Sequence, residues 1–104
     1  MARFVVRIEL PEKPHGAYGQ LHKDMHAEKY FTVVKDSKGN WWHLPHATYI
    51  ARGTNWNPAT IRDEVVNIAK RSHPHPRVYV AEYSSSAWSG LRPVTLKDPA
   101  PTYP

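Results

Sequence analysis

Two runs of β-branched and aromatic residues, Tyr30–Lys35 and Trp41–Ala51, constrain the fold of this chain more than any other feature. Residues of these types suit a half-buried pleated surface, so both runs are predicted to be strands. The residues between them end in Gly39-Asn40, and glycine and asparagine are the types that most readily adopt positive φ. We therefore predict a β-hairpin whose tight turn sets which residues face each other.

The segments on either side of the hairpin complete an order of strand, helix, strand, strand, helix, strand. Residues 3–10 and 77–83 alternate between polar and apolar types, which is typical of strands packed on one side. Residues 16–29 carry an apolar stripe at helical spacing, and Asn57-Pro58 has the capping residue and the first-turn proline that begin a second helix. This order predicts an α+β protein with the ferredoxin-like βαββαβ fold, a four-stranded antiparallel sheet with both helices on one face.

A chain of 104 residues suits a single core of modest size. We expect one ferredoxin-like domain over residues 1–92, followed by a proline-rich C-terminal arm over residues 93–104. The predicted fold leaves one sheet face open, and that face includes Val5 and an outer tryptophan. Because small proteins rarely leave such apolar surface wet, we expect a homodimer.

Composition excludes several classes of protein. The absence of cysteine rules out disulfides, zinc–thiolate sites and cysteine nucleophiles. No apolar run approaches the roughly 20 residues of a membrane helix, and the N-terminus has no signal-peptide pattern. We therefore expect a cytoplasmic protein with no membrane partner. The glycine motifs of nucleotide-binding loops and the nucleophile elbow of hydrolases are also missing.

A net charge of +5, with histidines neutral, favours polyanionic partners and above all nucleic acid. Arg3 and Arg7 share the outer face of the first predicted strand at about 7 Å, close to the spacing of successive phosphates. Aromatic residues of the hairpin could offer stacking surfaces on the same face. The alternative is that the arginines are solvated or paired with Glu9, and that Trp41 packs under the arm or in a dimer. The predicted nucleic-acid-binding residues are Arg3, Arg7, Lys35, Lys38, Trp41 and Tyr49.

Among the 7 histidines, His43 and His46 flank Leu44-Pro45 on the hairpin. Cleavage of RNA without a metal needs a general base and a general acid near neutral pKa, which a histidine pair can supply. We predict His43 and His46 as this catalytic pair. His22 and His26 have the four-residue spacing that recurs in zinc sites, but no third ligand is indicated. We therefore expect no metal and no other cofactor.

Four parts of the chain together resemble one protein family: the opening Ala2–Leu10, the Tyr18–Met25 helix, the strand with Leu44-Pro45, Ala47 and Tyr49, and the late Trp88–Leu91. Over residues 2–91 they are similar to small bacterial and phage proteins related to the GhoS-type endoribonuclease antitoxin of type V toxin–antitoxin systems. The resemblance implies a ferredoxin-like fold and RNA binding or RNA cleavage. The acidic residue that related CRISPR nuclease subunits place at the end of the first strand appears here only as Glu9 followed by Leu10, which argues against a metal-dependent reaction.

Two functions from different classes follow. The first is an RNA-binding protein of the antitoxin type, either with or without activity as a metal-independent endoribonuclease. The second is a non-catalytic interaction protein, such as a phage-encoded inhibitor of a host defence or regulatory system, which binds a partner protein through the open sheet face. A cationic surface suits both.

Overall fold

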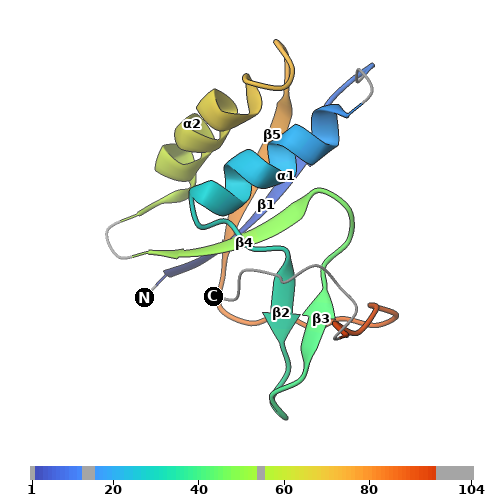
Figure 1. Ribbon diagram of the computed structural model, residues 1–104. Helices are drawn as coiled ribbons and strands as arrows, with labels where there is room; N and C mark the ends of the chain where they lie inside the picture. The colour runs from blue at the N-terminus through green and yellow to red at the C-terminus, as the bar shows by residue number, and fades with distance from the viewer. Residues whose placement is uncertain (1, 13–15, 54–55, 96–104) are drawn as a thin grey trace.

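In residues 2–12, 16–53 and 56–95, which the computed structural model describes, the chain forms two helices and two antiparallel sheets (Figure 1). The elements follow in the order β1 (Ala2–Glu9), α1 (Ala17–Ala27), β2 (Val33–Lys35), β3 (Trp41–His43), β4 (Thr48–Gly53), α2 (Pro58–Ala69) and β5 (Arg77–Tyr83). The predicted α+β class is confirmed. Within these ranges, neither helix combines the length and apolar character needed to cross a membrane.

Strand β1 is the centre of the larger sheet, whose order is β4-β1-β5 with antiparallel pairing on both sides. Its alternating sequence separates two faces, with Phe4, Val6 and Ile8 buried on one side. Both helices lie on that side of the sheet (Figure 1). Both helices therefore pack on the buried face of this three-stranded sheet.

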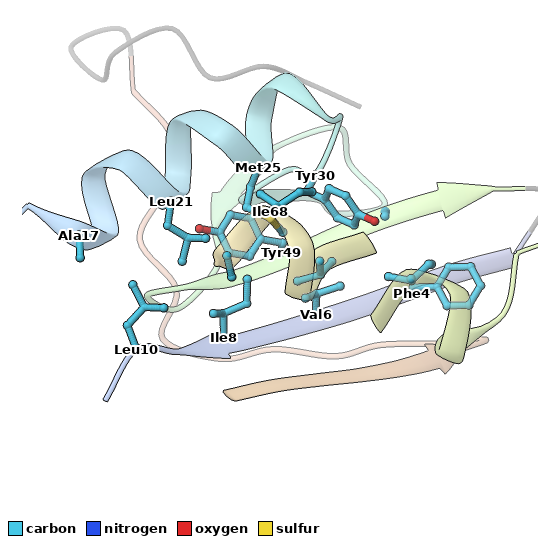
Figure 2. Close-up of a cluster of buried hydrophobic side chains, with 14 residues drawn as sticks. Phe4, Val6, Ile8, Leu10, Ala17, Leu21, Met25, Tyr30, Tyr49 and Ile68 are labelled. Atoms are coloured by element: carbon cyan, nitrogen blue, oxygen red, sulfur yellow. The ribbon is translucent and has the colours of Figure 1, made fainter. Parts of the chain in front are cut away.

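The core lies between the larger sheet and the two helices, and Figure 2 shows its side chains. Its fully buried side chains belong mainly to β1 and to both helices. Two tyrosines complete it, of which Tyr30 precedes β2 and Tyr49 lies in β4. The largest of them are Tyr30, Tyr49, Phe4, Ile8, Leu21, Met25 and Ile61. Helix α2 begins as predicted, because the side-chain oxygen of Asn57 accepts the backbone N–H of Thr60 at 2.9 Å and Pro58 occupies the first turn.

The predicted single strand from Trp41 to Ala51 is wrong. It is divided into β3, which pairs with β2, and β4, which pairs with β1. Pro45 lacks the N–H that a strand would use and restricts the residue before it, so β3 ends ahead of it. A turn follows in which Ala47 has φ 54° and the N–H of Thr48 donates to the carbonyl of Pro45. This turn redirects the chain from the smaller sheet to the larger one.

The predicted hairpin itself is confirmed as the pair β2–β3. One carboxylate oxygen of Asp36 accepts the backbone N–H groups of Lys38 and Asn40, each at 2.9 Å, and Gly39 takes positive φ. A single four-stranded sheet does not form in the described ranges, because β2 pairs with β3 rather than with β4. The larger sheet meets this region through an isolated bridge between Phe31 and Ile50.

After β5 the chain crosses to the smaller sheet. The carbonyl of Arg92 accepts the N–H of His43 at 2.9 Å, and the N–H of Val94 donates to the carbonyl of Trp41 at 3.1 Å. Pro93 forms an isolated bridge with Trp42. The start of the predicted arm is thus paired with β3, and the arm from residue 96 onward lies outside the described residues.

Candidate nucleic-acid interface

The sheet face opposite the helices carries cations and aromatic rings in register. Arg3 on β1 lies opposite Arg52 on β4 and Tyr83 on β5. Residues opposite one another in antiparallel strands place their side chains on the same face. In the next row, Val5 lies opposite Ile50. A charged row therefore borders an apolar one on the open face.

A small hollow of about 140 Å³, here named the cationic pocket, lies between this face and the smaller sheet. The guanidinium carbon of Arg3 lies 5.1 Å from the ring centroid of Tyr83, and Lys35 Nζ lies 5.6 Å from that of Trp41. These distances are those of cation–π contacts. No carboxylate occurs among the described residues that line it: Arg3, Val34, Lys35, Trp41, Ile50, Arg52, Tyr83, Ser86 and Trp88. The pocket thus combines positive charge with flat ring surfaces.

A larger hollow of about 460 Å³, here named the apolar pocket, adjoins the cationic pocket. Val5 and Ile50 of the larger sheet line it together with Leu44 and Pro45. The other wall is the segment after β5, which contributes three serines and a tryptophan between residues 85 and 91. The two pockets share Val34, Ile50, Tyr83, Ser86 and Trp88. They are therefore neighbouring parts of one cleft.

A third hollow of about 260 Å³, here named the histidine pocket, lies beside the turn between β3 and β4. Among the described residues, its lining includes His22, His26, His43 and His46, as well as Arg92. The rings of His22 and His46 meet edge to face with centroids 5.7 Å apart. Leu44 and Pro45 also line this pocket, so the histidine and apolar pockets share that dipeptide as a common wall.

Burial lowers the pKa of two histidines that line the histidine pocket. Burial, together with the nearby His46 and His26, lowers the pKa of His22 below its ordinary value. Burial also lowers the pKa of His26. Both rings are therefore neutral at pH 7 and able to accept a proton. In the part of the chain that the structure describes, no group of three or more histidine or acidic side chains is arranged to hold a metal ion.

Of the predicted binding residues, the structure brings Arg3, Lys35 and Trp41 to the cationic pocket. Arg7 shares the open face, but it lies toward the other end of β1 and donates to the carbonyl of Ile8 at 2.6 Å. Lys38 lies in the turn of the β2–β3 hairpin, outside the lining of the cationic pocket.

The predicted stacking role of Tyr49 is incompatible with its position. Its ring is fully buried in the core, and its register partner is the core residue Val6. The turn at residues 44–47 breaks the alternation that would have placed Tyr49 on the same face as Trp41. Tyr49 instead forms a hydrogen bond with Nδ1 of His22. It therefore holds His22, which lines the histidine pocket, rather than offering a ring to a base.

The predicted catalytic residues His43 and His46 both line the histidine pocket. His22 lines it as well, although its four-residue spacing from His26 was only a weak indication of a metal site. Of the charged and aromatic residues that line the cationic pocket, Arg52, Tyr83 and Trp88 were not predicted. For Arg52 and Tyr83, the available signal was the alternation of side chains between the two faces along β4 and β5. Trp88 follows the last strand in an irregular segment, where no periodic pattern applies.

Comparison with known proteins gives no family assignment: no protein-family model matches the chain, and no curated protein matches it. The similarity to GhoS-type antitoxins therefore stays a prediction.

Proposed function

We propose that this protein binds single-stranded RNA in the cleft formed by the cationic and apolar pockets. The observation that carries the proposal is the lining of the cationic pocket, where the described residues include three cations and three aromatic rings. Proteins that bind single strands combine a positive groove for the backbone with aromatic rings on which bases stack. The same cleft suits RNA because serine hydroxyls beside it can bond a 2′-hydroxyl.

The position of the rings favours an unpaired strand over a duplex. Trp41, Tyr83 and Trp88 are half-buried in the lining of the cationic pocket. Bases within a duplex are stacked on each other and cannot reach such a recess, whereas unstacked bases can. The β4-β1-β5 order with both helices on one face agrees with part of a ferredoxin-like sheet, and we retain that fold and its RNA-binding use as part of the proposal.

Removing two cations of the pocket tests this proposal. We expect the double variant Arg3→Ala/Arg52→Ala to bind a labelled single-stranded RNA more weakly, with a flatter dependence on salt, because fewer counterions are released. The slope of log affinity against log salt should change by about 1.4, since each phosphate that is no longer neutralised changes it by roughly 0.7. Fluorescence polarisation at several salt concentrations measures both quantities.

Lys70→Ala/Arg71→Ala is the matched control, because it removes the same charge from exposed residues at the end of α2. It should keep the wild-type slope. An unchanged slope in Arg3→Ala/Arg52→Ala, or an equal loss in the control, would place the binding surface elsewhere.

A second candidate function is metal-independent cleavage of the bound RNA in the histidine pocket. The observation that favours it is the convergence of His22, His43 and His46 on one hollow that shares a wall with the apolar pocket. A neutral imidazole can take the proton of a 2′-hydroxyl as its oxygen attacks the adjacent phosphorus, and a second imidazole in its protonated form can give its proton to the 5′ oxygen that leaves. A guanidinium can stabilise the charge of the phosphorane between these two steps. Arg92 in the pocket lining supplies that guanidinium.

The interaction-protein function uses the same cleft for a partner protein and predicts no binding to RNA. The predicted homodimer also stays a prediction. Part of the open face is already occupied by the chain itself, since the segment after β5 forms one wall of the apolar pocket. Titration with RNA distinguishes the proposed RNA binding from the interaction-protein function.

A further inference from the structure

We propose that the apolar pocket is a selective subsite for one unpaired RNA base, whose own phosphate is held in the cationic pocket. This inference rests on the proposed RNA binding. It adds that binding depends on which base is offered, whereas an open cationic surface would bind all single strands alike.

Size and charge suit this occupant. The volume of about 460 Å³ lies within the roughly 300–1,000 Å³ range of small-ligand pockets. Its lining is apolar at Val5, Ile50 and Leu44, which matches the flat faces of a base. An apolar ligand without charge would make no use of the adjoining Arg3 and Arg52, while a nucleotide fills both parts of the cleft. The continuity of the two pockets therefore points to a base joined to a phosphate.

Polar groups at the rim give a means of selection. Ser85, Ser86 and Ser89 contribute hydroxyls to the lining, and a hydroxyl can both donate to and accept from a base edge. Ser86 belongs to both pockets, so it lies where the base and its sugar–phosphate would join. A base whose edge leaves these hydroxyls unpaired would bind less tightly, because unpaired polar groups lose their hydrogen bonds to water.

Val5→Trp tests the subsite by filling it with an indole. Wild-type protein is titrated with short single-stranded RNAs of adenine, cytosine or uracil alone, and their affinities are expected to differ by about 10-fold or more. Val5→Trp should lose most of this difference and bind the preferred RNA about 10-fold more weakly, while its salt slope stays that of wild type. Thr48→Trp is the control, since it adds the same indole to the same sheet face outside the lining of both pockets.

A second pair of measurements covers the case in which Val5→Trp does not fold. Ser89→Trp blocks the apolar pocket from an exposed loop residue that lies outside the lining of the cationic pocket, and it leaves the sheet intact. The fluorescence of 2-aminopurine placed in the preferred RNA should change on binding to wild type and not on binding to Ser89→Trp.

The outcomes separate the two proposals. Binding with equal affinity for all three RNAs, or blocked variants that keep the wild-type preference, would overturn the subsite and leave RNA binding in place. Failure of wild type to bind any of the RNAs would overturn both.

Discussion

Replacing Phe4 by alanine is expected to lower the free energy of unfolding by about 3–5 kcal/mol. The ring is fully buried on the central strand, facing the helices within the core (Figure 2). Alanine would leave a cavity that the strand cannot close, because β1 is held by pairing on both edges. Since whole domains are stable by only about 5–15 kcal/mol, this loss is a large part of the total. Urea denaturation followed by circular dichroism measures it.

Tyr79→Ala is the matched control for Phe4→Ala. It removes an aromatic ring from the neighbouring strand β5, but this ring is 68% exposed. We expect a loss below about 1 kcal/mol, set by strand preference rather than by a cavity. Equal losses in the two variants would mean that the buried face of β1 is not the core.

If the protein cleaves RNA, His46→Ala is expected to lower the cleavage rate by about 10²-fold or more, and His43→Ala and His22→Ala should act in the same direction. His46 lies in the lining of the histidine pocket, next to the ring of His22. Removing one imidazole takes away the base or the acid and leaves the cationic pocket intact, so RNA binding should stay close to wild type. Cleavage of a labelled single strand, measured with and without a chelator, gives the rates.

The pH dependence of cleavage follows from the same groups. Because burial lowers the pKa of His22, a rate that needs this ring neutral should rise at a pH below the ordinary histidine pKa of about 6.5. The rate should then fall again as the second imidazole, the acid, loses its proton. The bell-shaped profile reports pKa values that belong to the coupled groups together.

His75→Ala is the control for the histidine variants, because His75 is exposed and lies outside the lining of the histidine pocket. Full activity in the His43 and His46 variants would remove the imidazole mechanism, and loss of activity with a chelator would require a metal. If wild type binds RNA without cleaving it, the second candidate function fails while the binding proposal stands.

Local patterns in the sequence were enough to predict both helices, the first and last strands and the buried face of β1. Alternation along residues 3–10 correctly separated Phe4 and Ile8 from Arg3, because the side-chain period of a strand is fixed by the backbone. Asn57 and Pro58 correctly located the start of α2 for an equally local reason.

The break between β3 and β4 was not predicted. Strand preference is high on both sides of Leu44-Pro45, and it does not tell whether two segments join the same sheet. Ala47 adopts positive φ without belonging to a residue type that favours it. This one turn explains why Trp41 lies at the cleft while Tyr49 lies in the core.

The site could be predicted only where it depends on short-range pattern. Lys35 and Trp41 lie opposite each other in the hairpin that the sequence indicates. Arg52 and Tyr83 reach Arg3 only through the pairing of three strands that are distant in sequence. The histidine pocket likewise forms where α1 packs against the β3–β4 turn, and this packing is not visible in the sequence. The spacing of His22 and His26 alone therefore indicated only a zinc site.

RNA binding in the cleft is tested most directly by photo-crosslinking. A single-stranded RNA that carries 4-thiouridine is irradiated with the full-length protein, and the modified peptides are identified by mass spectrometry. We predict adducts on Trp41, Tyr83 or Trp88, the aromatic residues of the cationic pocket, and their loss in Arg3→Ala/Arg52→Ala. Adducts confined to the surfaces of α1 and α2, or no adduct at any RNA concentration, would contradict RNA binding at this cleft.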